Sequence, residues 1–528
     1  MFFQTDTAKD KILIVFDKSI TIYGLADLQV LHGNVWVNNF QLNPSANTQR
    51  IYSPKTNSLI SLTYGGPSGE SLIPNDILEV LNANDIKLDC NNCVLLLDKL
   101  DFHAIHHKYP EYRYIFGKSE KETLEIYPSE ESPLPTLQIT ESWIRAFQDL
   151  NNSVHSVFVC GSKNVGKSTF SRCLLNGFLS NYDKVIYVDF DVGQPEFTPP
   201  GLVSARVISK PVFGPPFTHA ISNNHHEDFE SCKYVGTLNI NDNPLEYLKA
   251  CTSVMTSVHN YINQSKQRYP IIFNSLGWIK GIGLEIIKEL NGQNDAKIFF
   301  DDLFTTPRVF SKSSQNDLES FVVLENTNLI ELSSSSPSQF SFQPFDHRTL
   351  RFMFYLSHNP EYPLSFDPRP LSSVPPFVIP FNDVALCIPF EKIERSNYLL
   401  AFNASLVALL YNPNYHFDEN STPKNFPRFL RNECEAVGES QCLGYGFIRS
   451  IDHKNCLYHL ITPLSSDKLS KVNIIARSNM DLQPSMLTPA VRDMNAPYIE
   501  HLAAEGLGAM QRRVRQNIKR NALGSHKP

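Results

Sequence analysis

The run GSKNVGKS at residues 161–168 constrains the fold of this chain more than any other feature. It follows an apolar segment at residues 157–160, which is typical of a short buried strand, and it precedes a helical pattern at residues 168–179. A strand, a loop with GxxxxGKS spacing and a helix together predict a phosphate-binding loop. We therefore expect an α/β protein whose central domain contains a parallel sheet and this loop.

Each residue type in the loop suits phosphate chemistry. The glycines let successive backbone N–H groups converge on phosphate oxygens, and the positive end of the following helix faces the same point. Lys167 would reach the β- and γ-phosphates of ATP, and the Ser168 hydroxyl would be a ligand of Mg²⁺. The residues predicted to bind ATP are Gly161, Ser162, Lys163, Asn164, Val165, Gly166, Lys167, Ser168 and Thr169.

A second apolar run, at residues 184–190, leads into two carboxylates. Asp189 and Asp191 would stand at the carboxyl end of a strand beside the loop, where an acidic residue that holds a metal ion or takes part in catalysis belongs. With Ser168 they are the predicted ligands of Mg²⁺. The loop motif and the strand that ends in carboxylates support each other, so we expect nucleotide binding. The alternative is a structural loop that matches the motif by chance.

Two further candidates follow at the same edge of the sheet. Residues 193–201, which include Gln194, form a turn-rich segment directly beyond the strand, so a functional loop is favoured over a plain connection. Residues 270–274 predict the next strand, which leads to Trp278 between glycines. This ring would either belong to the core or face a groove and stack on a base, and the groove is favoured.

Strands at residues 296–300 and 320–324 would complete a five-stranded parallel sheet with alternating helices. Beyond them, residues 346–358 predict a helix that carries Arg348 and Arg351 about one turn apart, so that both can face one way. Two such arginines form either a solvated face or, in a phosphotransferase, a lid over the transferred phosphate.

The first 135 residues show a β pattern. Short runs of apolar or alternating character are separated by glycine, asparagine and proline, which predicts a sandwich or an open barrel. A stretch with charges, serines and prolines at residues 119–136 predicts a linker into the central domain. The predicted strands are 12–16, 19–23, 28–32, 35–37, 40–42, 94–98 and 113–116.

Cys90 and Cys93 are followed by His103 and by His106 or His107, which superficially matches a zinc site. The gap between the two pairs is shorter than the usual finger spacing, and it contains VLLLDKLDF, which is typical of a core strand. Buried thiols and surface histidines are therefore the favoured interpretation.

A proline-rich passage from residue 359 leads into a third region. Strands are expected at residues 384–388 and 458–461, and the type of the element at residues 399–410 stays open. The chain is therefore predicted to contain three domains. These are a β-rich N-terminal domain (1–135), the phosphate-binding domain (136–370) and a smaller mixed C-terminal domain (371–528).

Composition excludes several classes of protein. Of the 528 residues, 42% are apolar and 19% are charged, which indicates a soluble globular chain. No apolar run approaches the roughly 18 residues of a membrane span, and ten scattered cysteines indicate reduced thiols inside a cell. The net charge of −7 argues against a general nucleic-acid coat. Residues 508–520 are nevertheless strongly basic and would form a solvated tail or a localisation signal.

Four of these stretches, GSKNVGKST, DFDVGQPEFTPPG, NSLGWIKGIG and HRTLRFMFYL, together resemble the eukaryotic polynucleotide 5′-hydroxyl kinases. The segment FTPPG favours the nucleolar branch, the Grc-type and NOL-type kinases of pre-ribosomal RNA processing, over the branch of mRNA cleavage and tRNA splicing. The N-terminal runs YGLADLQVLHGNVWVNN and IYSPKTNSLISL resemble the same branch. The resemblance implies an ATP-dependent kinase of RNA 5′-hydroxyl ends in the nucleus, and within it the nucleolus.

The resemblance also implies a role for each matching residue. Lys167 and Ser168 would bind phosphate and Mg²⁺, Asp191 would act on the 5′-hydroxyl and the metal, and Trp278 would clamp the terminal nucleotide. The implied catalytic residues are Lys167, Asp191, Arg348 and Arg351, the last two as the lid, and the implied RNA-binding residues are Gln194 and Trp278. The implied partner is an endoribonuclease of the HEPN class that cuts the internal transcribed spacer. The basic tail would dock on this nuclease or on RNA.

Two other functions are compatible with the phosphate-binding loop. The chain would then be a scaffold with a structural nucleotide site, or an NTPase that acts as a conformational switch. Neither explains an aromatic ring at a groove together with a carboxylate poised for an acceptor, so the kinase is the preferred hypothesis.

Overall fold

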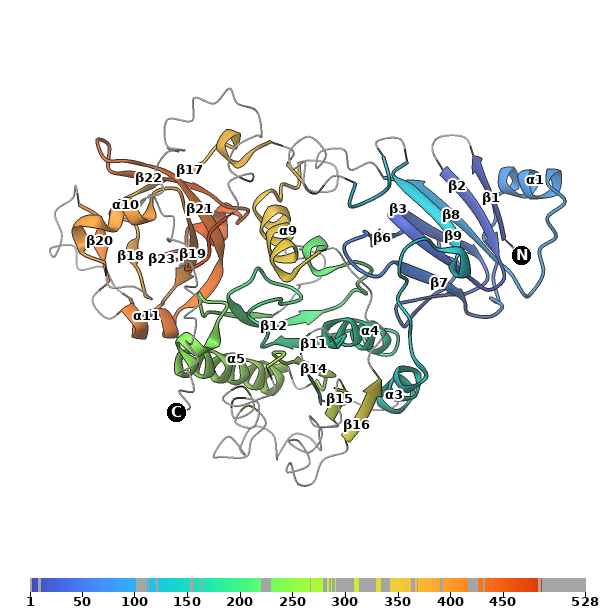
Figure 1. Ribbon diagram of the computed structural model, residues 1–528, viewed down its shortest axis with the longest axis horizontal. Helices are drawn as coiled ribbons and strands as arrows, with labels where there is room; N and C mark the ends of the chain where they lie inside the picture. Colours follow the sequence, from blue (N-terminus) through green and yellow to red (C-terminus); the bar gives the residue numbers. More distant parts are fainter. Residues whose placement is uncertain are drawn as a thin grey trace, which may run out of the picture. The chain divides into compact units, whose positions relative to one another are not determined.

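The computed structural model describes residues 2–7, 11–100, 112, 114–119, 122–151, 156–161, 163, 165–219, 229–265, 267–278, 283, 286, 290, 308–312, 329–333, 342–361, 366–367, 369–389, 393–415, 426–430, 433–482 and 486. The chain divides into two compact units, residues 1–369 and 370–528. In the described ranges the first unit contains two sheets and the second contains one (Figure 1). This mixed architecture, with its β-rich start, confirms the predicted fold class.

The central sheet is built around the phosphate-binding loop. Its strand order is β13-β12-β11-β14-β10-β15-β16, in which β11, β14, β10, β15 and β16 are parallel. At one edge β12 pairs antiparallel with β11, and β13 pairs antiparallel with β12. The strands are β10 (Ser156–Gly161), β11 (Val185–Asp189), β12 (Leu202–Ile208), β13 (Glu230–Tyr234), β14 (Ile271–Asn274), β15 (Arg308–Lys312) and β16 (Leu329–Ser333). The predicted strands at 296–300 and 320–324 lie outside the described residues.

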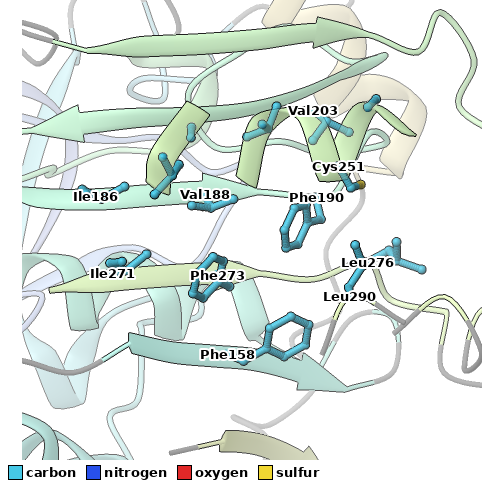
Figure 2. Packing of buried hydrophobic residues seen from close by; sticks show 14 of the residues in the cluster. Phe158, Ile186, Val188, Phe190, Val203, Cys251, Ile271, Phe273, Leu276 and Leu290 are labelled. Carbon is cyan, nitrogen blue, oxygen red and sulfur yellow. The ribbon is translucent and has the colours of Figure 1, made fainter. Parts of the chain in front are cut away.

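Helices cover both faces of this sheet because its central strands β10, β11 and β14 are buried on both sides. Val157 and Val159 of β10 pack in one cluster with residues of α3 (Glu141–Asn151) and α4 (Lys167–Leu179). Phe158 points to the opposite face, into a cluster with α5 (Pro244–Ser265) that includes Phe273 and Cys251 (Figure 2). The alternation fixes β10, and with it the start of the phosphate-binding loop, in the middle of a two-sided core.

The N-terminal sheet is organised around one long strand, β3. This strand pairs with β7 and β9 in its first half and with β6 and β8 in its second half. The strands are β1 (Phe2–Thr7), β2 (Lys11–Phe16), β3 (Ser19–His32), β4 (Val35–Val37), β5 (Phe40–Leu42), β6 (Gln49–Ser53), β7 (Ile60–Tyr64), β8 (Cys93–Lys99) and β9 (Leu124–Pro128). One face encloses a core, and α1 (Asn75–Ala83) packs on the other.

Three predictions for this domain were wrong. The strands at 19–23 and 28–32 are one strand, because Gly24 between them is paired with Ser53 on one side and Leu124 on the other. The described part of 113–116 is a turn rather than a strand, and it is held by Tyr23, whose hydroxyl donates to the carbonyl of Tyr114 at 3.0 Å. The proposed linker at 119–136 contains β9, and Leu124 and Ile126 of this strand pack in the core of the N-terminal sheet.

The zinc alternative gains no support from Cys93. Its side chain is buried in the N-terminal core, its thiol donates to the carbonyl of Asn34 at 3.1 Å, and burial raises its pKa to about 12. Residues 94–99 continue β8, as the apolar pattern predicted. His103, His106 and His107 lie outside the described residues.

The N-terminal sheet and the central domain share side chains. Phe213, which follows β12, belongs to the core of the N-terminal sheet, and its ring meets that of Phe40 edge to face at 6.0 Å. Asn176 of α4 donates to the carbonyl of Asn38 at 3.2 Å, and Asn39 donates to that of Cys173 at 3.0 Å. The first unit is therefore one packed body.

The second unit is a mixed sheet of order β17-β22-β21-β19-β23-β18-β20 with short helices. Its elements are β17 (Phe377–Pro380), β18 (Ala385–Cys387), α10 (Tyr398–Phe402), β19 (Ser405–Tyr411), β20 (Arg428–Phe429), α11 (Glu433–Glu439), β21 (Gln441–Asp452), β22 (Leu457–Ile461), α12 (Ser466–Leu469) and β23 (Ile474–Arg477). The ambiguous run at 399–410 is thus most of a helix followed by a strand. The basic stretch at 508–520 lies outside the described residues. Among the helices that are described, none has the length and apolar character to cross a bilayer.

Candidate active site

A cavity of about 490 Å³ opens where β10, β11 and β14 end. Its walls come from the phosphate-binding loop, from the segments that follow β11 and β14, and from α9 (Pro344–Leu356). Ligands in open α/β sheets bind at this edge, and the volume lies within the usual range for small-molecule sites. The sequence motifs therefore converge on one place.

The phosphate-binding loop turns into α4 at Gly166. This residue has φ of +95°, a conformation that favours glycine, and its carbonyl accepts from the N–H of Phe170 at 2.8 Å to close the first turn. The loop residues that line the cavity are Lys163, Gly166, Lys167, Ser168 and Thr169. Gly161 and Val165 are buried beside it, and Ser162 and Asn164 lie outside the described residues.

Lys167 is buried although it lines the cavity, with 7% of its surface exposed. Burial lowers its pKa, and the nearby carboxylate of Asp191 acts in the opposite direction. An anion in the cavity would favour the charged ammonium, because a bound negative group replaces the lost solvation. The site is therefore suited to phosphate at Lys167.

Asp189 and Asp191 have different environments. Asp189 is fully buried, and its carboxylate accepts from the N–H of Asp191 at 3.1 Å and the Asn274 amide at 3.0 Å. Asp191 lines the cavity, and its Oδ1 accepts from the N–H groups of Gly193 at 2.9 Å and Gln194 at 3.1 Å. Gln194 lines the cavity as well. Of the two carboxylates, only Asp191 lines the cavity.

Trp278 lies both on the core and at the cavity, and its stacking on a base stays a prediction. Its ring packs against the core cluster under α5, and it also lines the cavity with Leu276 and Gly277. The phosphate-binding loop lies against this segment, since a Cβ atom on Gly277 would stand 2.7 Å from Cγ and 3.1 Å from Cα of Lys163. A side chain at this position would crowd Lys163, so the loop and the Trp278 segment are in direct contact.

The helix α9 brings Arg348 and Arg351 to the cavity, as predicted. Arg351 is 5% exposed, and its Nη1 donates to the carbonyl of Thr198 at 3.2 Å. Burial lowers its pKa to about 10, although the negative charges of Glu196, Asp189 and Asp191 raise it. Burial also lowers the pKa of Arg348, which is opposed by Asp191. The helix thus brings two positive groups to the cavity that Asp191 also lines.

Several cavity residues were not predicted. Arg172 of α4 lies one turn after Ser168, so the helical spacing could have identified it. Asn57 lies in the β6–β7 loop of the N-terminal domain, and residues 238–241 lie between β13 and α5. Other unpredicted lining residues are Pro216, Phe217, Pro344 and His347. No local signal marks these positions, because they reach the cavity through tertiary packing.

The donor set fits a magnesium ion. The Ser168 hydroxyl and the Asp191 carboxylate line the same cavity, and Mg²⁺ prefers oxygen ligands and binds between one or two carboxylates and substrate phosphates. Asp189 is already satisfied by N–H donors, so it suits the role of a support for the Asp191 segment better than that of a direct ligand.

Three family models match the chain. Residues 1–132 match the N-terminal domain of the polynucleotide 5′-hydroxyl-kinase NOL9, residues 161–295 match the P-loop of the mRNA cleavage and polyadenylation factor CLP1, and residues 372–483 match the NOL9-like C-terminal domain. Together they cover most of the chain.

Two relatives with similar names match over most of the chain, and a third matches over about half of it. The chain is 25% identical to the polynucleotide 5′-hydroxyl-kinase nol9 of Dictyostelium discoideum, over 95% of this chain and 84% of the relative. It is 28% identical to human NOL9, over 88% of this chain and 73% of the relative. It is 31% identical to grc3 of Emericella nidulans, over 51% of this chain and 34% of the relative.

A solved structure shares the fold. The wild-type Clp1p–Pcf11p complex contains a chain that superposes with a TM-score of 0.56 at 14% identity, over 91% of this chain and 99% of that one. At this identity the match shows the fold alone.

Proposed function

The chain belongs to the NOL9/Grc3 family of polynucleotide 5′-hydroxyl kinases, and on that premise we propose that it transfers the γ-phosphate of ATP to the 5′-hydroxyl end of RNA. One observation carries the proposal: Lys167, Asp191 and Trp278, from three separate segments, line a single cavity. A kinase of this kind needs a cation for the phosphates, a carboxylate for the attacking hydroxyl and a surface for the acceptor nucleotide.

The donor side is the phosphate-binding loop. The N–H groups at the start of α4 and the ammonium of Lys167 would hold the triphosphate of ATP. Arg348 and Arg351 would stabilise the charge that spreads over the transferred phosphoryl group. Ser168 and Asp191 would hold a Mg²⁺ ion, which would supply further positive charge to the phosphates.

The acceptor side is formed by Asp191, Gln194 and Trp278. Trp278 would stack on the terminal nucleotide, with Gln194 beside it, and so bring the 5′-hydroxyl to the donor. Asp191 would orient that hydroxyl and accept its proton as the oxygen attacks in line. The new O–P bond forms as the bond from the γ-phosphorus to the bridging oxygen breaks, and ADP leaves. The N–H groups of Gly193 and Gln194 fix the direction of the Asp191 carboxylate.

Incubation of the purified chain with γ-labelled ATP and a short RNA tests the proposal. Label should appear on a 5′-hydroxyl RNA, be absent from the same RNA with a 5′-phosphate, and be lost with Lys167→Ala, which removes a phosphate contact. Release of free phosphate without labelled RNA would indicate the conformational switch. Nucleotide binding with neither product would indicate the scaffold.

We propose further that the reaction serves pre-ribosomal RNA processing in the nucleolus, in a complex with a HEPN-class endoribonuclease. The resemblance to the nucleolar branch and the basic stretch at residues 508–520 support this proposal. Charged segments of this kind give fast, salt-sensitive association with a complementary partner. Deletion of residues 508–528 should weaken the complex with the nuclease while the isolated chain still phosphorylates a short RNA. An unchanged complex would contradict a docking role for the tail.

A further inference from the structure

A buried ion pair adjoins the cavity and joins two of its walls. Arg172 of α4 donates from Nε to Oε1 of Glu196 at 2.6 Å and from Nη2 to Oε2 at 3.1 Å. The side chain of Glu196 is 0% exposed, whereas that of Arg172 is 11% exposed and lines the cavity. Of the two residues in this pair, only Arg172 therefore lines the cavity.

Glu196 makes two further contacts that fix its position. Its N–H donates to Oδ2 of Asp189 at 2.5 Å, and its Oε1 accepts from Nε2 of His219 at 3.0 Å. Burial alone would raise the pKa of Glu196, but Arg172 and His219 outweigh burial and hold that pKa at about 2. Burial lowers the pKa of His219, so Arg172 is the main positive partner of this carboxylate.

Three arginines hold three consecutive residues of the same segment. Arg172 from α4 binds the side chain of Glu196, Arg206 from β12 donates to the carbonyl of Phe197 at 2.8 Å, and Arg351 from α9 donates to that of Thr198 at 3.2 Å. Asp191 lies a few residues earlier on this segment. A shift of the segment would therefore change the positions of Asp191 and Arg351 relative to the phosphate-binding loop.

The geometry indicates a positional role for this pair. Desolvation offsets most of the attraction in a buried ion pair, so such a pair is a weak source of stability. A guanidinium that meets both oxygens of a carboxylate nevertheless fixes distance and orientation in one plane. Here that constraint connects the helix of Lys167 and Ser168 to the segment of Asp191.

We propose that Glu196 is a positioning residue for phosphoryl transfer, which holds Arg172 and through it sets the Asp191 segment against the phosphate-binding loop. The inference rests on the proposed function and adds a residue that does not itself line the cavity. A misplacement of reacting groups by about 1 Å lowers a rate by about 10²-fold. Binding of ATP and of RNA depends on other residues and should change little.

The test is steady-state kinetics of Glu196→Gln in the full chain, below its melting temperature. We expect kcat for RNA phosphorylation to fall about 10²-fold, with KM for ATP and for RNA within about threefold of the wild type. The double variant Glu196→Gln/Arg172→Gln should be within about threefold of Arg172→Gln alone, because residues that act as a unit are not additive. A kcat of Glu196→Gln within about twofold of the wild type would overturn the proposal.

Asn176→Ala is the matched control for a loss of stability alone. Asn176 lies on the same helix, is fully buried, and bonds to Asn38 and Val212 away from the cavity. It should lower the melting temperature and leave kcat near that of the wild type. A proportional loss of kcat in this control would show that destabilisation alone explains the Glu196 result.

Arg172→Lys is the second test, in case Glu196→Gln does not fold. Lysine keeps the charge opposite Glu196 but cannot bind both oxygens in one plane, so kcat should fall while the fold is retained. A wild-type kcat in Arg172→Lys would count against a positioning role. If the wild type releases phosphate but labels no RNA, the kinase proposal fails. The same variants then test the Glu196 proposal on the rate of phosphate release.

Discussion

Asp189 and Asp191 illustrate how neighbouring carboxylates take different roles. Burial raises the pKa of Asp189 to about 7, although three N–H donors oppose the shift. Asp191 is only partly buried and opens onto the cavity. The carboxylate of Asp189 bonds to the protein and so supports the loop, whereas that of Asp191 faces the cavity and can contact a substrate. The structure therefore favours Asp191 as the base or metal ligand.

Asp191→Asn should slow transfer by about 10²-fold or more, the scale of a general-base contribution. The amide oxygen can still accept from Gly193 and Gln194, so the turn should persist and ATP should still bind. Single-turnover rates and ATP affinity, measured across a Mg²⁺ titration, check this prediction. Recovery of the rate at high Mg²⁺ would instead assign Asp191 to metal retention.

Trp278→Ala should raise KM for RNA about tenfold and leave KM for ATP nearly unchanged. The reason is the loss of base stacking, which contributes about 1–3 kcal/mol per base. Trp278→Phe, which keeps an aromatic face, is the control and should retain most of the affinity. Because the ring also packs on the core, the melting temperature is measured in parallel. An unchanged KM in a destabilised protein would leave Trp278 only its core role.

The site residues differ in how far the sequence predicts them. Lys167 and Ser168 follow from a local motif whose spacing dictates the geometry, and Asp191 follows from its place after a strand. Arg172 could have been found from its spacing to Ser168 on the helix. Glu196 meets its partner only after α4 and the β11–β12 segment have packed, so no pattern within a short window reveals it.

At the scale of elements, α9 makes stability depend on pH through His347. Burial and the neighbouring charge of Arg351 lower the pKa of His347 to about 4, with Arg348 acting in the same direction and Asp346 against it. A histidine whose pKa is lowered by folding stabilises the protein above its unfolded pKa of about 6.5. That contribution is lost as the pH falls from about 6.5 towards 4, because the unfolded chain takes up the proton first.

His347→Asn should therefore be less sensitive to acid than the wild type. Between about pH 7 and pH 5 the wild type should lose up to about 2 kcal/mol more unfolding free energy than the variant, a figure that partial exposure of the ring reduces. Thermal unfolding at a series of pH values measures the difference. Parallel curves for the two proteins would show that His347 is not the group that titrates.

The elements that the sequence missed lack a clear local pattern. The strand β12 is buried on both faces, but Ser204 and Arg206 interrupt its apolar sequence pattern. The strand β13 has the polar sequence ESCKY. Both strands are stabilised by pairing at the edge of a sheet that already exists. Helices such as α4 and α9 were predicted because their periodic apolar faces extend over more than three turns.

At the scale of the whole molecule, Phe213 links the N-terminal and central domains. Phe213→Ala should destabilise the first unit by about 3–5 kcal/mol, the usual range for a buried phenylalanine. The N-terminal sheet, not only the central domain, should lose protection against proteolysis. Phe178→Ala is the control, because Phe178 is equally buried but packs within the central domain. An N-terminal sheet that stays fully protected in Phe213→Ala would contradict a shared core.

The division into domains at 135/136 and 370/371 stays a prediction. The sequence suggested a linker before the central domain, but β9 and the bridge between Leu59 and Thr136 continue the N-terminal sheet through that region. Long-range pairing of this kind leaves no mark on local composition, which is why the linker could not be distinguished from a strand.

The position of Phe213 also bears on how the protein is made. The last strand of the N-terminal sheet ends at Pro128, and the ribosome must add roughly 85 more residues before Phe213 exists. At about 5–20 residues per second, that interval is between about 4 and 17 seconds. The nascent N-terminal sheet then exposes the apolar surface that Phe213 will cover, so we expect a chaperone to bind this surface before the central domain emerges.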